Sequence, residues 1–234
     1  APGVVAAAAF CARIAEVWSA RVRRRIIVNT GNTAETSIDP KGRPGVRVML
    51  DAMWVQAMEH AGWALRHRRI WVKGGPNPHT APHMDSVDQS CEALLTFWRV
   101  GKNEGGQERT SEPWSISGYF DDIKGVGKDV VGDDHPCPYP AEMPRRFILL
   151  YSKPGDIVAE PFSGAGTTII AAEMVGRRCY AMEMTSNYVD TAVRRWQKFT
   201  GERAMLATTG ATFEETAATR WAAAEDASMA EPAA

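Results

Sequence analysis

The chain lacks the cysteine and histidine spacings that mark metal sites and disulfide frameworks. Only four cysteines occur among its 234 residues, far apart and without a C-x-x-C pair: Cys11, Cys91, Cys137 and Cys179. Of the five histidines, His79 and His83 are the pair closest to ligand spacing, but a proline stands between them. We therefore expect neither a bound metal nor a disulfide framework.

Long apolar runs are also missing. No stretch approaches the ~20 apolar residues that a membrane-spanning helix needs, and residues 1–10 lack the basic start of a secretory signal. We expect a cytoplasmic protein with no membrane partner. A hydrophobic content of 44% and a charged content of 24% are ordinary for a globular protein. The length suffices for one large α/β domain with an insertion.

Neither sign of charge is in excess, because the formal net charge is −1. This excludes a chain that is basic throughout. Residues 1–73 nevertheless carry 12 Lys and Arg against 5 Asp and Glu. The basic residues gather in two clusters, namely Arg21, Arg23, Arg24 and Arg25, and then Arg66, Arg68, Arg69 and Lys73. Each cluster is interpreted either as phosphate contacts or as solvated surface at the starts of strands, away from a ligand site.

One stretch in the second half of the chain reads as a strand, a glycine turn, a helix and a second strand. Residues 156–160 form a short apolar strand, and Gly164 and Gly166 interrupt the pattern before a helix that begins at Thr167. These glycines either adopt positive φ or let a ligand approach the backbone. Glu183 ends the second strand. Because a βαβ unit binds ligands at the carboxyl ends of its strands, and a carboxylate about 20 residues after the glycines suits a ribose diol, we expect a nucleoside-bearing cofactor.

The glycine turn departs from the dinucleotide fingerprint G-x-G-x-x-G, since Ile169 replaces the third glycine. This disfavours a dehydrogenase-like enzyme. The turn instead resembles the [D/N]-P-F-x-G-x-G-T-T loop of the amino-DNA methyltransferases, which methylate adenine N6 or cytosine N4 with S-adenosylmethionine. The resemblance implies that the loop wraps the methionine part of this cofactor and that Glu183 holds its ribose. Glu160 stands where the family usually has Asp. The implied cofactor-binding residues are Glu160, Pro161, Phe162, Ser163, Gly164, Ala165, Gly166, Thr167, Thr168 and Glu183.

A second match lies just before this stretch. The segment H-P-C-P-Y-P, residues 135–140, resembles the H-P-A-x-[FY]-P segment that precedes the glycine loop in the same family. The resemblance implies that His135 and Pro136 complete the cofactor pocket. Further likenesses in the first half place a catalytic segment first, a recognition region next and the cofactor segment last, which is the β order of this family.

The family's catalytic tetrapeptide, [D/N/S]-P-P-[Y/F/W], is absent. It should stand just before the helix predicted at residues 4–19. The P-C-P-Y of residues 136–139 imitates it but lies in the cofactor-pocket segment, and Cys137 is not interpreted as the nucleophile of a cytosine-C5 enzyme. Two explanations remain: the natural protein begins upstream of residue 1, or this chain has lost the catalytic loop. Without the tetrapeptide, adenine and cytosine targets are not distinguished.

The predicted fold is α/β, a Rossmann-like S-adenosylmethionine-dependent methyltransferase fold with a mostly parallel central sheet and a loop-rich recognition insertion. Helices and strands alternate before residue 73, which implies crossover connections. The predicted parts are a catalytic-side half (1–73), a target-recognition insertion (74–134), a cofactor-binding half (135–200) and a partly disordered tail (201–234). Within the tail we expect a short helix at 212–224 and disorder from 225.

The expected function is methyl transfer to an exocyclic amine of DNA, as in restriction–modification systems, phages or mobile elements. The alternative is a catalytically inactive remnant that binds the cofactor and DNA. Asn29, Trp114 and Lys124 are the candidate substrate-binding residues, since Asn29 ends a predicted strand and the other two lie in the aromatic and basic insertion. That insertion is interpreted equally as plain surface. Asn29 is interpreted equally as a residue that stabilises the turn after its strand. DNA is the expected partner, and a homodimer is the candidate assembly.

Overall fold

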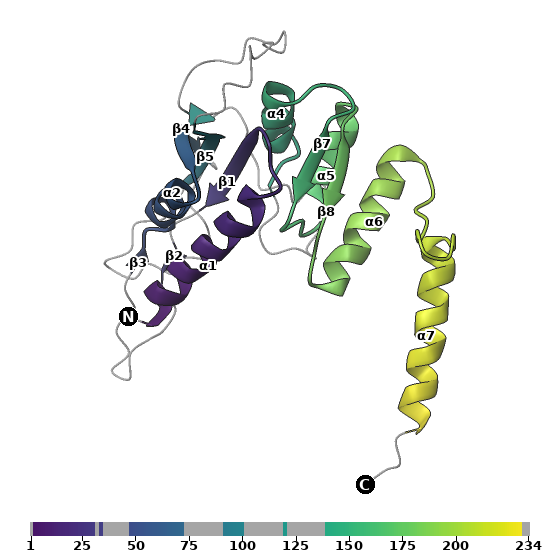
Figure 1. Ribbon diagram of the computed structural model, residues 1–234. Coiled ribbons are helices and arrows are strands. Elements are labelled where there is room, and N and C mark those ends of the chain that lie inside the picture. The colour runs from purple at the N-terminus through teal and green to yellow at the C-terminus, as the bar shows by residue number, and fades with distance from the viewer. Residues whose placement is uncertain are drawn as a thin grey trace. The chain divides into compact units, whose positions relative to one another are not determined.

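The computed structural model describes residues 2–30, 33–34, 47–72, 91–100, 119–120 and 139–230 (Figure 1). The chain divides into two compact units. The first comprises Ala1–Val126 and Leu149–Lys153, and the second comprises Gly127–Ile148 and Pro154–Ala234.

A four-stranded sheet and two helices make up the first unit. In chain order its elements are α1 (Pro2–Ser19), β1 (Arg25–Thr30), β2 (Thr33–Ala34), β3 (Arg47–Val48), α2 (Leu50–His60), β4 (Trp63–Val72), β5 (Cys91–Arg99) and β6 (Tyr119–Phe120). The strand order is β1-β5-β4-β6, and β2 and β3 form a separate antiparallel pair. Strand β5 runs antiparallel to both β1 and β4, whereas β4 and β6 are parallel.

The prediction of a mostly parallel sheet is not confirmed in the described strands. β1 and β4 do run in the same direction, as the crossover through α2 requires, but β5 lies between them with the opposite direction. Five consecutive residues of β5, Ala93 to Phe97, are buried. A strand covered on both faces belongs in the interior of a sheet. The structure therefore places residues 91–99 in the centre of the sheet, although the sequence assigned them to the recognition insertion.

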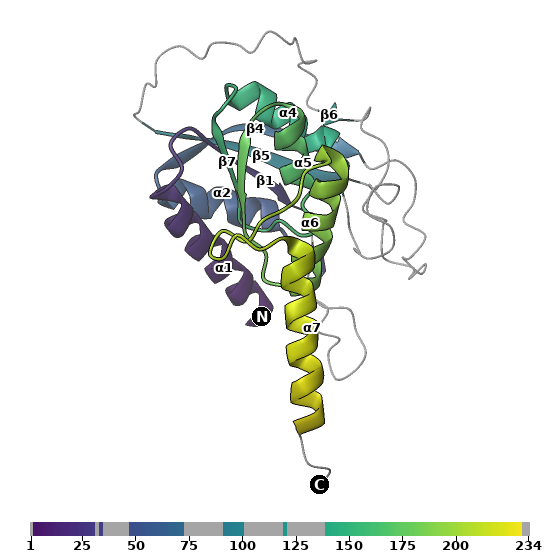
Figure 2. The ribbon, with the colours of Figure 1, turned by 90° about the vertical axis from the view of Figure 1, so that its right-hand side faces the viewer.

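Helices α1 and α2 cover one face of this sheet, and the two ribbon views show them along the same side (Figures 1 and 2). The core between them consists of Cys11, Ala15, Trp54, Met58, Trp63, Ala93, Leu95 and Phe97. Trp63 is fully buried, and its indole N–H donates to the Ser19 hydroxyl at 2.9 Å, so the end of α1 is tied to the start of β4. Full burial of each large side chain contributes about 1.5–3 kcal/mol.

The second unit contains the predicted strand–helix–strand. Its elements are α4 (Glu142–Tyr151, whose last residues belong to the first unit), β7 (Ile157–Glu160), α5 (Thr167–Met174), β8 (Arg178–Ala181), α6 (Ser186–Thr200) and α7 (Phe213–Ala230). β7 and β8 pair in parallel. The small side chains of Ala171 and Ala172 on α5 pack with Val158 and Cys179 on the sheet and with Ile148. The predicted strand, helix and strand are therefore confirmed as β7, α5 and β8.

The C-terminal helix is longer than the predicted 212–224. Thr212 and Glu215 form a capping box at its start: the Glu215 N–H donates to the Thr212 hydroxyl at 3.2 Å, and the Thr212 N–H donates to the Glu215 carboxylate at 2.8 Å. The helix then continues to Ala230. The helix includes residues 225–230, where the sequence predicts a frayed or disordered end, and residues 231–234 lie outside the described part. Within the described ranges, no helix is both long and apolar enough to cross a bilayer.

Candidate cofactor site

The loop between β7 and α5 has its shape fixed by two glycines and by β8. Gly164 and Gly166 adopt φ values of +51° and +79°, in the region that non-glycine residues rarely enter. The Gly166 N–H donates to the Ser163 carbonyl at 2.9 Å, and the Ser163 N–H donates to the Met182 carbonyl at 3.0 Å. The loop is thus a tight turn joined to the end of β8, as the sequence predicts.

Glu183, two residues after the end of β8, accepts hydrogen bonds from the loop and from the residues that follow it. One carboxylate oxygen accepts the Gly164 N–H at 2.8 Å, and the other accepts the N–H groups of Met184 and Thr185 at 2.9 and 2.8 Å. These hydrogen bonds, that of Thr185 first, hold the pKa of Glu183 below its ordinary value, because they stabilise the charged form. A carboxylate oxygen that accepts one hydrogen bond, as Oε2 does here, can accept another.

Glu160, at the end of β7, clamps the loop a second time. Its Oε1 accepts the Phe162 N–H at 2.9 Å, and its Oε2 accepts the Thr168 hydroxyl at 2.9 Å. The Tyr139 hydroxyl lies 3.0 Å from the same Thr168 oxygen. Since Thr168 gives its only hydroxyl proton to Glu160, Tyr139 is the donor to Thr168. The three side chains therefore form a directed relay that ends on a carboxylate.

The relay lies in a buried environment, which raises the pKa values of Tyr139 and of the neighbouring Cys179. Burial raises the pKa of Tyr139, and the nearby Glu160 carboxylate raises it further. Burial, again followed by the charge of Glu160, raises the pKa of the Cys179 thiol to about 12. Tyr139 therefore stays a hydrogen-bond donor over the physiological pH range, and Cys179 stays a neutral thiol without nucleophilic character.

Helix α6 packs closely behind the loop. A Cβ atom added at Gly166 would lie 2.7 Å from the Cβ and 3.1 Å from the Cα of Ala192. Gly166 is therefore required by helix packing, whereas the sequence left the approach of a ligand as one explanation. One turn later, Arg195 donates to the Ala165 carbonyl and to the Thr167 hydroxyl. Sequence reasoning missed both α6 residues, although they share the inward face of an amphipathic helix.

Large apolar side chains are exposed beside the loop. Phe162 is 54% exposed, Met182 57% and Met184 98%, whereas Ser163 is buried. The Ser163 hydroxyl has no hydrogen-bond partner within the described part of the chain. An exposed apolar border next to a buried, unsatisfied hydroxyl is an arrangement that a ligand with both apolar and polar groups would complete.

The structure brings together all the predicted cofactor residues from Glu160 to Thr168 and also Glu183. Asn29 is exposed near the carboxyl end of β1, in the first unit, paired with Leu94 across the sheet. His135, Pro136, Trp114 and Lys124 lie outside the described residues. In the described ranges no three metal-binding side chains form a cluster.

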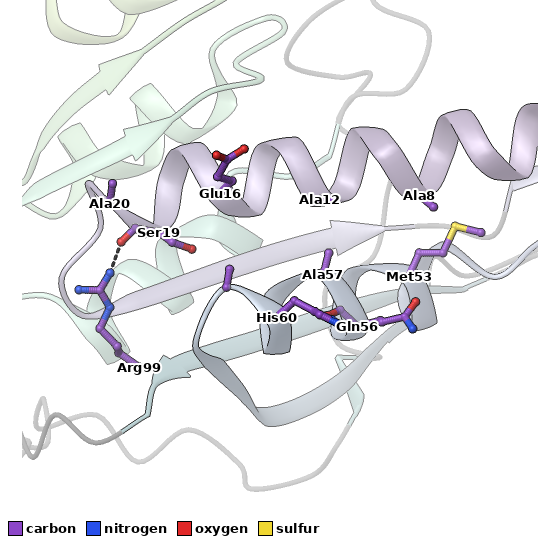
Figure 3. A pocket seen from close by; sticks show the side chains of 11 residues that line it. Ala8, Ala12, Glu16, Ser19, Ala20, Met53, Gln56, Ala57, His60 and Arg99 are labelled. Carbon is purple, nitrogen blue, oxygen red and sulfur yellow. Dashed lines mark hydrogen bonds between the residues drawn. The ribbon is translucent and has the colours of Figure 1, made fainter.

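A separate hollow of about 770 Å³ lies between α1 and α2 in the first unit (Figure 3). Small side chains such as Ala12 and Ala57 line it, and Arg99 at its end donates to the Ser19 carbonyl. None of the residues predicted from the sequence as site residues lines this hollow. The candidate site is therefore the loop of the second unit.

Comparisons with known proteins show which family the chain resembles. A family model described as DNA methylase matches residues 15–194. The type II methyltransferase M.BglI of Bacillus subtilis is 30% identical over 150 residues, which cover 62% of this chain and 42% of that protein. The type II methyltransferase M.Cfr9I of Citrobacter freundii is 30% identical over 143 residues, covering 60% and 47%. The chain thus spans less than half the length of these curated relatives.

Solved structures show the same fold. A candidate DNA modification methylase of Thermus thermophilus, crystallised with S-adenosyl-L-methionine, superposes with a TM-score of 0.63 at 24% identity, covering 82% of this chain and 78% of that one. The cytosine-N4-specific PvuII DNA methyltransferase superposes with a TM-score of 0.60 at 21% identity, covering 81% and 70%. The α/β methyltransferase fold is therefore established.

We predict that Gly166→Ala destabilises the protein more than Gly155→Ala. Both glycines have φ near +80°, so each substitution costs about 1–2 kcal/mol of backbone strain. Only Gly166 also faces Ala192, which adds about 1–3 kcal/mol of overpacking. Free energies of unfolding in urea measure the difference. Equal losses for the two variants would show that α6 does not press on the loop.

We predict that Tyr139 and Thr168 are energetically coupled. Tyr139→Phe should cost about 0.5–1.5 kcal/mol, and Thr168→Val about 1–3 kcal/mol because it leaves the Tyr139 hydroxyl and Glu160 without their partner. The double variant should lose less than the sum, by about 0.5 kcal/mol or more. Urea unfolding of the four proteins gives the coupling energy, and strictly additive losses would contradict the relay. Thr168→Ser, which keeps the hydroxyl, is the control.

We predict that Glu183 stabilises the protein at neutral pH and not in acid. Because its folded-state pKa lies below the ordinary 4.5, its contribution is present above that value and is lost as the pH falls through the folded-state pKa. The difference in unfolding free energy between the wild type and Glu183→Gln should therefore shrink between about pH 7 and about pH 3. A constant difference would contradict the hydrogen-bonded carboxylate. Glu202→Gln controls for the loss of one charge.

Proposed function

Because the chain belongs to the DNA methylase family whose model matches residues 15–194, we propose that it serves the transfer of a methyl group from S-adenosylmethionine to an exocyclic amine of DNA, adenine N6 or cytosine N4. The observation that carries this proposal is the glycine loop held between the Glu160 and Glu183 carboxylates. The names of the two curated relatives, both type II methyltransferases, support it and favour a restriction–modification role.

The residues of the loop fit the proposed cofactor. Glu183 ends its strand with capacity for a further hydrogen bond, which suits a ribose hydroxyl. The Ser163 hydroxyl offers a buried polar atom, and the exposed Phe162 and Met184 offer apolar contact to an adenine ring. We propose that residues 160–168 hold the methionine part of the cofactor, with His135 and Pro136 completing the pocket.

The reaction requires little covalent chemistry from the protein. Residues 160–168 and Glu183 would hold S-adenosylmethionine, which would supply a methyl group activated by its sulfonium and would leave as the neutral thioether. The amine nitrogen would gain the methyl group and give up one proton to solvent or to a neighbouring oxygen. The protein then contributes position and a preorganised electrostatic environment. Access to the amine requires the target base to leave the duplex. We propose that Asn29, together with Trp114 and Lys124 of the insertion at 74–134, contacts the DNA.

A second candidate function rests on the sequence itself. The tetrapeptide that would hold the amine, [D/N/S]-P-P-[Y/F/W], does not occur in the 234 residues. A chain that binds the cofactor and DNA without transferring a methyl group would satisfy every other observation. We propose that either form acts in the cytoplasm, and we keep the homodimer as a prediction.

We predict that the full chain binds S-adenosylmethionine and not NAD, as measured by calorimetry. Gly164→Val, which forces a branched residue into positive φ, and Glu183→Ala should each weaken binding more than tenfold, about 1.4 kcal/mol. Gly210→Val, at another positive φ outside the loop, is the matched control and should bind as the wild type does. Affinity for NAD alone, or unchanged affinity in both loop variants, would overturn the assignment.

A further inference from the structure

Arg25 of the first arginine cluster and Arg66 of the second, which are separate in the sequence, lie near Trp98 of the sheet in the first unit. Arg25, which opens β1, pairs across the sheet with Trp98 near the end of β5, and Trp98 pairs in turn with Ala64 of β4. Arg66 follows on β4, and its guanidinium lies 4.7 Å from the centre of the Trp98 ring. The antiparallel β5, which the sequence did not place here, carries the Trp98 that both arginines lie near.

Trp98 and Arg66 are both accessible to a partner. Trp98 is 39% exposed, and Arg66 is exposed. A guanidinium that lies over an aromatic ring is held by the ring's face, and its N–H donors, which lie in the plane of the guanidinium, can still bind a phosphate in a bidentate manner. The stack therefore holds Arg66 in place without consuming its donors.

The pKa of His67 reflects the positive charge of the arginines near Trp98. Burial lowers the pKa of His67, and the charges of Arg69, Arg66 and Arg25 lower it further. Three guanidinium groups therefore act on one point of the surface. His67 stays neutral at pH 7 and can donate a hydrogen bond without adding to the repulsion among the arginines.

Not every arginine of the strand takes part. Arg68 donates to the Asp51 carboxylate of α2 at 2.9 Å, so it points to the helix-covered face. The surface is defined by Arg25, Arg66, His67 and Trp98, and we call it the strand-start surface.

The uneven distribution of charge along the chain indicates that the partner is negatively charged. Residues 1–73 carry 12 basic against 5 acidic residues, a balance of +7, so a total of −1 leaves −8 for residues 74–234. A polyanion is therefore attracted to the first part of the chain and repelled by the rest. An aromatic ring beside arginines is typical of surfaces that bind nucleic acid.

We propose that the strand-start surface binds the phosphodiester backbone of DNA away from the target base. Arg25 opens β1, and Asn29, the candidate base contact, lies about 13 Å further along the strand at ~3.3 Å per residue. The contact reads no sequence. It holds flanking DNA while the base is engaged elsewhere. This proposal rests on the proposed function only in naming DNA as the partner.

The test compares two variants that remove the same charge from the same unit. Arg66→Gln alters the strand-start surface, and Arg13→Gln alters an exposed arginine that pairs with Glu16 on α1. The affinity of the full chain for a labelled DNA duplex is measured by anisotropy over a series of salt concentrations. Arg66→Gln should weaken binding by about 3–10-fold near 0.1 M salt and reduce the slope of log K against log salt by about 0.9. Arg13→Gln should leave the slope unchanged.

Two further measurements separate this proposal from the proposed function. Arg25 is half-buried, and its guanidinium lies 5.7 Å from the centre of the Tyr151 ring. The double variant Arg25→Gln/Arg66→Gln should therefore lower the salt slope more than Arg66→Gln alone, by up to about 1.8 in all, while calorimetry shows wild-type affinity for S-adenosylmethionine. A wild type that does not bind the duplex, or equal effects of Arg66→Gln and Arg13→Gln, would overturn the surface. If the wild type does not bind S-adenosylmethionine, but Arg66→Gln still weakens DNA binding more than Arg13→Gln, the proposed function is refuted and the proposed DNA contact of the strand-start surface is supported.

Discussion

The candidate site depends on two carboxylates that accept backbone N–H groups of one short loop. Glu160 binds the Phe162 N–H, and Glu183 binds the Gly164 N–H from the neighbouring strand. A glycine-containing loop loses much conformational entropy when it is fixed, and its amide N–H groups need partners. Two carboxylates at the ends of two adjacent parallel strands supply these partners. The pairing of β7 and β8 therefore shapes the loop, and α6 packs against it.

The sequence predicted the second unit well because its signals are local. An apolar run, a glycine turn and a helix within residues 156–183 fixed the order of the elements and the place of Glu183. The first unit was predicted less well, since its centre is made by long-range pairing. β5 pairs with strands that are far from it in the sequence, and nothing within residues 91–99 predicts that they lie between β1 and β4. The apolar run predicts a strand but does not predict which strands pair with it.

The same limit applies to side chains. Tyr139 and Thr168 are 29 residues apart in the sequence, and only the 3.0 Å distance between their hydroxyl oxygens shows that Tyr139 belongs to the same hydrogen-bond chain as Glu160. Glu160 uses its two carboxylate oxygens on two different partners, the Phe162 amide and the Thr168 hydroxyl. The sequence alone does not indicate either contact.

The two clamps also bear on the choice between cofactors. A dinucleotide loop binds a pyrophosphate through free backbone N–H groups at a helix N-terminus. Here the N–H groups of Phe162 and Gly164 are already given to carboxylates, so the loop offers fewer donors and carries negative charge. Such a loop repels a pyrophosphate, because like charges a few ångströms apart repel each other. S-adenosylmethionine has a sulfonium and an ammonium and no phosphate, whereas NAD would bring its pyrophosphate next to the two carboxylates.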